Sequence, residues 1–148
     1  MNPGKKIKYF LFGSKPGIAE AAKEKILSSY DNVEIAGCHH GYFSPEDEDR
    51  IIDMINRSGA DILLVALGAP KQEKWIYENK DRLKVKVCIG VGGSLDVLSG
   101  KVKLAPEFFR RNGLEWLYRL YKEPRRFKRM LDLPRFILRV IWNRITKA

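Results

Sequence analysis

The stretch Asp61-Ile62-Leu63-Leu64-Val65-Ala66-Leu67-Gly68-Ala69-Pro70-Lys71-Gln72-Glu73-Lys74-Trp75 decides the fold of this 148-residue chain. Its first seven residues are apolar at nearly every position, which is typical of a strand buried on both faces in a parallel sheet. A glycine and a proline then introduce a helical pattern that runs from Pro70 to about Lys80. A buried strand followed at once by a helix predicts one βα unit.

The same alternation repeats on both sides of this unit. It predicts an α/β fold in residues 1–104, a Rossmann-like parallel sheet flanked by helices. Ser44 is a plausible N-cap and Pro45 fits the first helical position of one of these helices. The other predicted strands are Lys8–Phe12, Val33–Gly37 and Val85–Val91, and the other predicted helices are Ile18–Ser29 and 45 to about 58.

Ligands of such open sheets bind outside the C-terminal ends of the strands. Four turns follow the predicted strands, at 13–17, 39–43, 68–72 and 92–96, and any site should be assembled from them. The glycines of these turns let a ligand approach the backbone, and helix starts offer free N–H groups.

Each candidate in these turns also has a purely structural interpretation. The turn with Gly13 and Lys15 suits a phosphate, or is an ordinary glycine-rich βα turn, because no Walker or dinucleotide spacing is present. Gln72 suits a sugar hydroxyl or a diphosphate oxygen, or it caps its helix. After Gly92 and Gly93, Asp96 suits a ribose, a base edge or a general base, or it is a carboxylate at a helix N-terminus.

Residues 105–148 form a different segment, which we predict to be a basic helical appendage. Residues 1–100 carry 14 Lys+Arg and 14 Asp+Glu, whereas 101–148 carry 14 basic and 4 acidic residues, so the net charge of +10 lies there. Pro106–Tyr121 is predicted to be one helix, followed by 125–131 and 135–145. The last has an apolar stripe among arginines, which indicates an interfacial amphipathic helix, or else a dimer or core helix.

The basic segment predicts an anionic partner, with a solvated charge run as the alternative. Arg119, Arg126 and Arg129 share a face if their helix is continuous, and guanidinium groups suit bidentate phosphate binding. Their alternative role is adhesion to a membrane surface. A nucleic-acid-binding domain is not expected, because no aromatic sheet face or recognition helix is evident.

Neither a metal nor another cofactor is expected. Cys38 and Cys88 are interpreted as reduced, buried thiols, and His39 and His40 beside Cys38 lack a second cluster that would complete a zinc site. No signal peptide and no apolar stretch of about 18–20 residues is present. We therefore expect a cytoplasmic protein whose contact with a membrane would be peripheral.

Taken together, the motifs resemble those of the WecG/TagA/CpsF glycosyltransferases over essentially the whole chain. The matching segments are Gly13-Ser14-Lys15-Pro16-Gly17, His40-Gly41-Tyr42-Phe43, Gly68-Ala69-Pro70-Lys71-Gln72-Glu73, Gly90-Val91-Gly92-Gly93-Ser94-Leu95-Asp96, and a run from Ala105-Pro106-Glu107 through Gly113-Leu114-Glu115-Trp116 to Glu123-Pro124-Arg125-Arg126.

The resemblance implies an inverting, metal-independent transfer of N-acetylmannosamine from UDP-N-acetylmannosamine to undecaprenyl-diphosphate-linked N-acetylglucosamine, as in wall teichoic acid synthesis. It implies that the basic appendage attaches to the inner face of the bacterial plasma membrane and closes its arginines over the active site. Homo-oligomers are also among the expected partners. Expected to bind the nucleotide sugar are Gly13, Lys15, Gly41, Tyr42, Gly92, Gly93 and Asp96, and expected to act in catalysis are Gln72, Arg119, Arg126 and Arg129.

One departure from the family pattern concerns the general base. Family members are longer and carry an Asp-Gly motif whose aspartate is the proposed base, and no Asp-Gly dipeptide occurs in this sequence. We therefore expect the chain to bind UDP but to transfer sugar slowly by itself, and to expose an apolar strand edge. The alternative function is a catalytically incomplete module that binds UDP and membrane.

Overall fold

The computed structural model describes residues 6–102, 105–122, 135–136, 138–140 and 142–143. The chain divides into two compact units, Met1–Lys103 and Leu104–Ala148, which are described separately below.

The first unit is built on one parallel sheet of four strands in the order β2-β1-β3-β4. The strands are β1 (Lys8–Gly13), β2 (Glu34–His39), β3 (Ile62–Ala66) and β4 (Val87–Gly90). The central strands β1 and β3 carry the buried apolar runs, because neighbouring strands and helices surround them on all sides. The predicted α/β fold with a parallel sheet is therefore confirmed.

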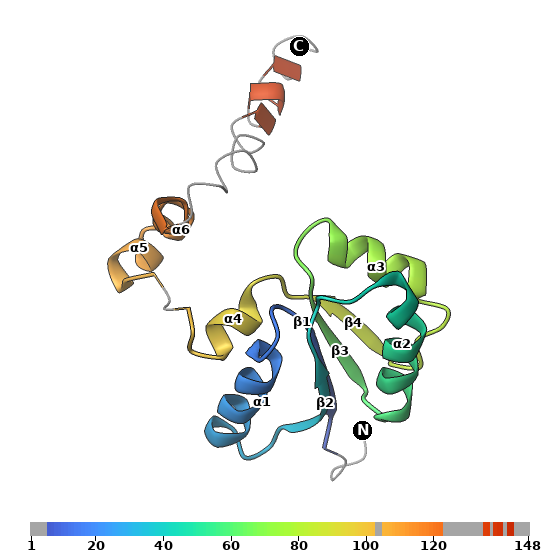
Figure 1. The fold of residues 1–148 in the computed structure, drawn as a ribbon. Helices are drawn as coiled ribbons and strands as arrows, with labels where there is room; N and C mark the ends of the chain where they lie inside the picture. Colours follow the sequence, from blue (N-terminus) through green and yellow to red (C-terminus); the bar gives the residue numbers. More distant parts are fainter. Residues whose placement is uncertain (1–5, 103–104, 123–134, 137, 141, 144–148) are drawn as a thin grey trace. The chain divides into compact units, whose positions relative to one another are not determined.

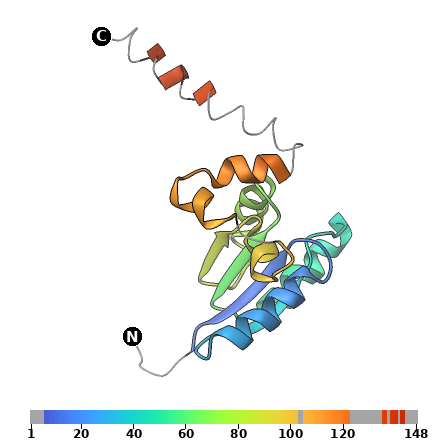
Figure 2. The same cartoon turned by 90° about the vertical axis from the view of Figure 1, so that its left-hand side faces the viewer.

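Helices cover the two faces of this sheet (Figures 1 and 2). On one face, α1 (Ile18–Ser29) and α4 (Ser94–Leu98) bury a cluster that includes Leu11 and Leu95. On the other, α2 (Glu48–Arg57) and α3 (Lys71–Asn79) enclose a second cluster around Phe10, Phe12 and Trp75. The stripe Ile51, Ile52 and Ile55 on α2 recurs at helical spacing, which is why this segment packs as a helix.

The strand order contains a topological switch point. The chain leaves β1 toward β2 on one side and then returns to β3 and β4 on the other, so the two halves of the winding diverge between β1 and β3. The register places Gly13 of β1 opposite Ala66 of β3, so both strands end at the same level. In sheets of this topology, the ligand crevice lies outside the carboxyl ends of the strands at that point.

Strand β4 is shorter and more exposed than the predicted strand Val85–Val91. It spans four residues at the edge of the sheet, and the side chains of Val87 and Ile89 are 46% and 43% exposed. Cys88 packs against the helix-covered cluster on the opposite face. The expected exposed apolar strand edge is therefore present, because the helices on the α1 face do not extend over β4.

The second unit contains α5 (Glu107–Arg111) and α6 (Glu115–Lys122). The prediction of one helix from Pro106 to Tyr121 is wrong, because Gly113 has a φ of 67° and ends the first helix. The N–H of Leu114 donates to the carbonyl of Phe109 (2.8 Å), and the ring of Phe109 packs on Tyr118 with 5.4 Å between centroids. Two short helices therefore replace one long helix.

The remainder of the predicted appendage is described only in part. Residues 135–136, 138–140 and 142–143 have helical backbone and exposed side chains, in agreement with the predicted helix at 135–145. The predicted segment 125–131 lies outside the described residues. Among the described residues, the structure contains no helix with the length and apolarity needed to cross a bilayer.

Candidate functional site

The turns at the carboxyl ends of the strands are tied to one another by backbone hydrogen bonds. The N–H of Ser14 donates to the carbonyl of Ala66, and the carbonyl of Ser14 accepts from the N–H of Gly41, each at 2.8 Å. The N–H of Val91 donates to the carbonyl of Val65, also at 2.8 Å. The turns after β1, β2 and β4 are therefore tied to one another and to the end of β3 at the predicted ligand edge.

Two of the predicted site glycines are needed for this close packing. Gly13 has a φ of 127°, and a Cβ there would lie 2.4 Å from the carbonyl carbon of Ala66. A Cβ at Gly41 would lie 2.6 Å from Cδ2 of Leu67 and 3.0 Å from Cα of Gly13. All three distances are shorter than van der Waals contact, so a larger residue would push the turns apart and distort the edge.

Asp96 is held at this edge by a serine from the first turn. The hydroxyl of Ser14 donates to Oδ2 of Asp96 at 2.9 Å, which links the end of β1 to the first turn of α4. Ser14 has a φ of 59°, a left-handed conformation that is uncommon outside glycine. Oδ1 of Asp96 has no hydrogen-bond donor among the described residues, so it is the oxygen left for a ligand.

Gln72 lies in the first turn of α3 and is only 6% exposed. Its Oε1 accepts a hydrogen bond from the N–H of Gly92 (3.0 Å), and its Nε2 donates to Oε1 of Glu73 (2.8 Å). A Cβ at Gly90 would lie 2.6 Å from Nε2 of Gln72, so the absence of a side chain at Gly90 makes room for the amide. Gln72 therefore joins α3 to the turn after β4, and its predicted contact with substrate stays a prediction.

The remaining predicted residues differ in their surroundings. Lys15 and Tyr42 are exposed, and Tyr42 is 64% exposed. Gly92 has a φ of 52° with open space around its Cα, and Gly93 is the N-cap of α4. The backbone here is open to a ligand. Arg119 lies in α6 of the second unit, and Arg126 and Arg129 lie outside the described residues.

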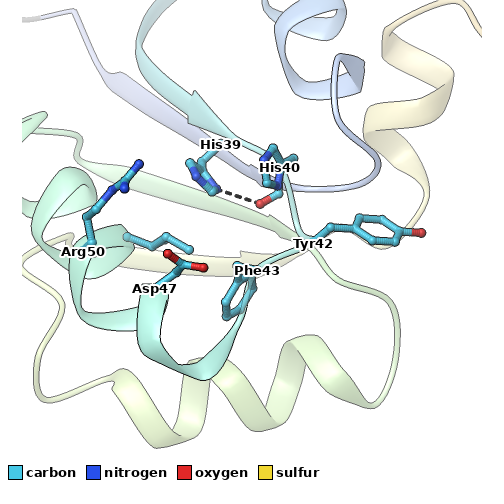
Figure 3. A pocket seen from close by; sticks show the side chains of 7 residues that line it. His39, His40, Tyr42, Phe43, Asp47 and Arg50 are labelled. Carbon is cyan, nitrogen blue, oxygen red and sulfur yellow. Dashed lines mark hydrogen bonds between the residues drawn. The ribbon is translucent and has the colours of Figure 1, made fainter.

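A pocket of about 180 Å³ opens beside this edge, between the end of β2 and α2 (Figure 3). The sequence predicted a ligand contact for the turn 39–43 and for Tyr42 in it, but it gave no ligand role to Asp47, Arg50 or Ile51, and Ser44 and Pro45 were recognised only as a helix start. That start is confirmed: Ser44 donates to Asp47 through its N–H and its hydroxyl, and Pro45 opens a 3₁₀ turn before α2. The residues that line the pocket are His39, His40, Tyr42, Phe43, Asp47, Arg50 and Ile51.

The cysteines and histidines do not assemble a metal site among the described residues. Cys38 and Cys88 are free, and burial raises the pKa of both thiols. A raised pKa keeps the thiol protonated at neutral pH and lowers its reactivity. Both thiols are free, as predicted, but they are half-buried and not buried as expected from the sequence.

The chain is an α/β protein with a Rossmann-like sheet, and its predicted ligand edge carries glycine turns, the carboxylate of Asp96 and the exposed ring of Tyr42. The chain belongs to the Glycosyl transferase WecG/TagA/CpsF family, which matches residues 2–148. The family resemblance of the sequence motifs is therefore confirmed.

Two curated relatives carry the same name, N-acetylglucosaminyldiphosphoundecaprenol N-acetyl-beta-D-mannosaminyltransferase. The protein of Bacillus subtilis (strain 168) is 43% identical over 137 residues, which is 93% of this chain and 53% of the relative. That of Bacillus spizizenii (strain ATCC 23059 / NRRL B-14472 / W23) is 39% identical over 93% of this chain and 52% of the relative. The chain thus spans about half the length of the curated relatives it matches.

Proposed function

We propose that this chain is the nucleotide-sugar-binding part of a glycosyltransferase that moves N-acetylmannosamine from UDP-N-acetylmannosamine to undecaprenyl-diphosphate-linked N-acetylglucosamine. The family is one of glycosyltransferases, and the names of both relatives state the acceptor and the transferred sugar. The observation that carries the proposal is the edge itself. It combines the glycine turns with Asp96, which Ser14 orients and whose Oδ1 is left for a ligand.

In this proposal the uridine diphosphate lies along the turns after β1, β2 and β4. The exposed ring of Tyr42 offers a stacking surface for the base, and Asp96 accepts hydrogen bonds from the base or the ribose. The open backbone at Gly92 and Gly93 allows the nucleotide to approach closely. No divalent metal takes part, because protein side chains and backbone N–H groups provide the contacts.

The basic second unit supplies the remaining partners in this proposal. Arg119, Arg126 and Arg129 bind the diphosphate of the donor or of the lipid-linked acceptor, where positive charge stabilises the leaving group. The helical residues near the C-terminus expose Phe136, Leu138, Val140 and Trp142, which suits the interface of a membrane. The proposed location is the cytoplasmic face of the plasma membrane, and homo-oligomers are part of the proposal.

Binding of UDP to the full chain tests the donor site. Isothermal titration with and without EDTA should give the same affinity. Asp96→Ala should weaken binding about 10–100-fold, because it removes a charge-assisted hydrogen bond of roughly 1.5–3 kcal/mol. Asp53→Ala, which removes an exposed carboxylate on α2, is the matched control and should bind UDP like the parent protein.

Three results would contradict the proposal or a part of it. Loss of UDP binding in EDTA would contradict the metal-free site. Equal affinities of the Asp96 and Asp53 variants would remove Asp96 from the site. Absence of any UDP binding by a folded chain, as judged by circular dichroism, would reject the donor site altogether.

A further inference from the structure

The pocket beside the ligand edge has a lining that the proposed nucleotide site does not use. Its residues come from the end of β2, from the loop after it and from the start of α2 (Figure 3). Tyr42 belongs both to the pocket and to the proposed nucleotide site, so the two are contiguous. The pocket lies entirely within the first unit.

Asp47 presents a carboxylate oxygen to this pocket. Its Oδ2 accepts from the hydroxyl of Ser44 at 2.7 Å and from the N–H of Ser44 at 3.2 Å, while Oδ1 has no donor among the described residues. The hydroxyl of Ser44, followed by its N–H, lowers the pKa of Asp47, with smaller contributions from Arg50 and His39. The group therefore stays ionised and offers a strong hydrogen-bond acceptor.

One of the two histidines that line the pocket, His39, has a defined tautomer. Nδ1 of His39 lies 2.8 Å from the carbonyl oxygen of His40, and a carbonyl can only accept, so Nδ1 carries the proton. In the neutral ring, Nε2 is then a hydrogen-bond acceptor. The rings of His39 and His40 lie in contact, tilted by 40° with 4.5 Å between centroids.

A donor and an apolar wall complete the lining. Arg50 forms no hydrogen bond or ion pair with any other described residue, so its guanidinium group has donors to offer. The ring of Phe43 is held by Phe12 at 5.5 Å and by Lys71, whose Nζ lies 5.2 Å from its centroid. Ile51 is buried beneath.

This combination selects among classes of ligand. A bare anion is opposed by the ionised Asp47, and the described residues contain no cluster suited to a metal ion. Acceptors, donors and an aromatic wall together suit a neutral molecule that carries hydroxyl groups and an amide. The volume is below the roughly 300–1,000 Å³ of sites for drug-sized ligands, which limits the occupant to about one small ring.

We propose that the pocket of His39, Phe43, Asp47 and Arg50 binds the ring of an N-acetylated hexosamine. Asp47 and His39 accept hydrogen bonds from the hydroxyl groups, Arg50 donates to the acetamido oxygen, and Phe43 contacts the apolar atoms of the sugar. The choice of this sugar class rests on the proposed function, whose donor and acceptor both contain such a ring. The pocket binds the groups that both rings have in common, the hydroxyl groups and the acetamido group.

The test is a nuclear magnetic resonance titration of the full chain, followed at the imidazole groups of His39 and His40. N-acetylmannosamine and the methyl glycoside of N-acetylglucosamine are the probes, and glucose and inorganic phosphate are the comparison compounds. Both acetylated sugars should shift the His39 signals. Arg50→Gln should weaken this binding by about tenfold, the effect of losing one hydrogen bond from a charged group.

Arg57→Gln is the matched control, because it removes the same charge from the same helix at a site outside the pocket. Asp47→Asn, which keeps the size of the side chain, should also weaken sugar binding. Equal affinities of the Arg50 and Arg57 variants would overturn the proposal. So would shifts caused by phosphate alone, which would make the pocket an anion site, or by glucose as strongly as by the acetylated sugars.

Nucleotide probes distinguish the two sources of the ring. If the ring belongs to the donor, UDP-N-acetylmannosamine should shift His39 at lower concentrations than the free sugar, and UDP alone should leave His39 unchanged. If it belongs to the acceptor, the N-acetylglucosamine glycoside should bind equally well in the presence of UDP-N-acetylmannosamine. Binding of UDP without any effect of the sugars on His39 would reject this pocket and leave the proposed function intact. Binding of the sugars without binding of UDP would reject the proposed function and leave this pocket intact.

Discussion

Two roles are open to Gln72 at the start of α3, contact with the substrate and support of the turn after β4. Removing its amide group tests them, because each role predicts a different combination of lost stability and lost UDP binding. In the structure, its Oε1 accepts a hydrogen bond from the N–H of Gly92, and the side chain is 6% exposed. Gln72→Met keeps an unbranched side chain of similar length but removes both polar atoms. The perturbation therefore leaves the N–H of Gly92 without its partner and little else changed.

The expected loss of stability follows from these contacts. An orphaned, partly buried N–H costs about 1–3 kcal/mol, whereas the bond to Glu73 involves an exposed partner and adds little. With a urea dependence of roughly 1–3 kcal/mol per molar for a small protein, the unfolding midpoint should fall by about 1 M. Lys74→Met, at an exposed position of the same helix, is the matched control and should stay within about 0.5 kcal/mol of the parent protein.

Urea unfolding followed by circular dichroism gives the stability, and amide hydrogen exchange at Gly92 reports on the bond directly. We expect faster exchange at Gly92 in the Gln72 variant, together with weaker UDP binding because the turn after β4 is less ordered. Equal unfolding midpoints and equal Gly92 exchange in the Gln72 and Lys74 variants would refute the structural role. If UDP binding nevertheless fell, Gln72 would act only as a ligand contact.

Two further predictions concern the basic segment and catalysis. Removing residues 125–148 deletes eight basic side chains and one acidic one, and each basic group near an anionic surface is worth about 1 kcal/mol. Sedimentation with anionic liposomes should therefore fall sharply and become less sensitive to salt, and unchanged sedimentation would contradict the membrane role. A positioned general base commonly raises a reaction rate by about 10²–10⁴-fold, and no Asp-Gly motif occurs in this sequence. The chain alone should therefore transfer sugar slowly, and the rate should rise when the Asp-Gly-containing half of a relative is added. Relative-like turnover by the chain alone would point to Asp96 or another carboxylate here as the base.

Much of the fold was predictable from local patterns. Strands β1 and β3 and helix α1 follow directly from apolar runs and from helical spacing, and the N-cap at Ser44 follows from the residue types that satisfy free N–H groups. The boundary at Gly113 was missed. A glycine within a helical pattern is tolerated often enough that the pattern alone predicts continuity.

The candidate edge was predictable in composition but not in geometry. The sequence by itself determined that the turns after the strands carry the glycines, Tyr42, Gln72 and Asp96, because parallel strands bring their carboxyl ends to one edge. It left open which side chains contact one another. Gly13 and Ala66 are far apart in sequence, and only the register of β1 on β3 brings them together.

The tertiary structure alone decided the partners of each polar group. The bonds from Ser14 to Asp96 and from Gly92 to Gln72 span 82 and 20 residues, and no periodicity encodes such pairs. The pocket of His39 and Arg50 likewise forms only where the end of β2 meets α2. Local sequence determines strands, helices and turn residues through short-range sterics and burial, whereas contacts between turns depend on how the whole sheet is paired and packed.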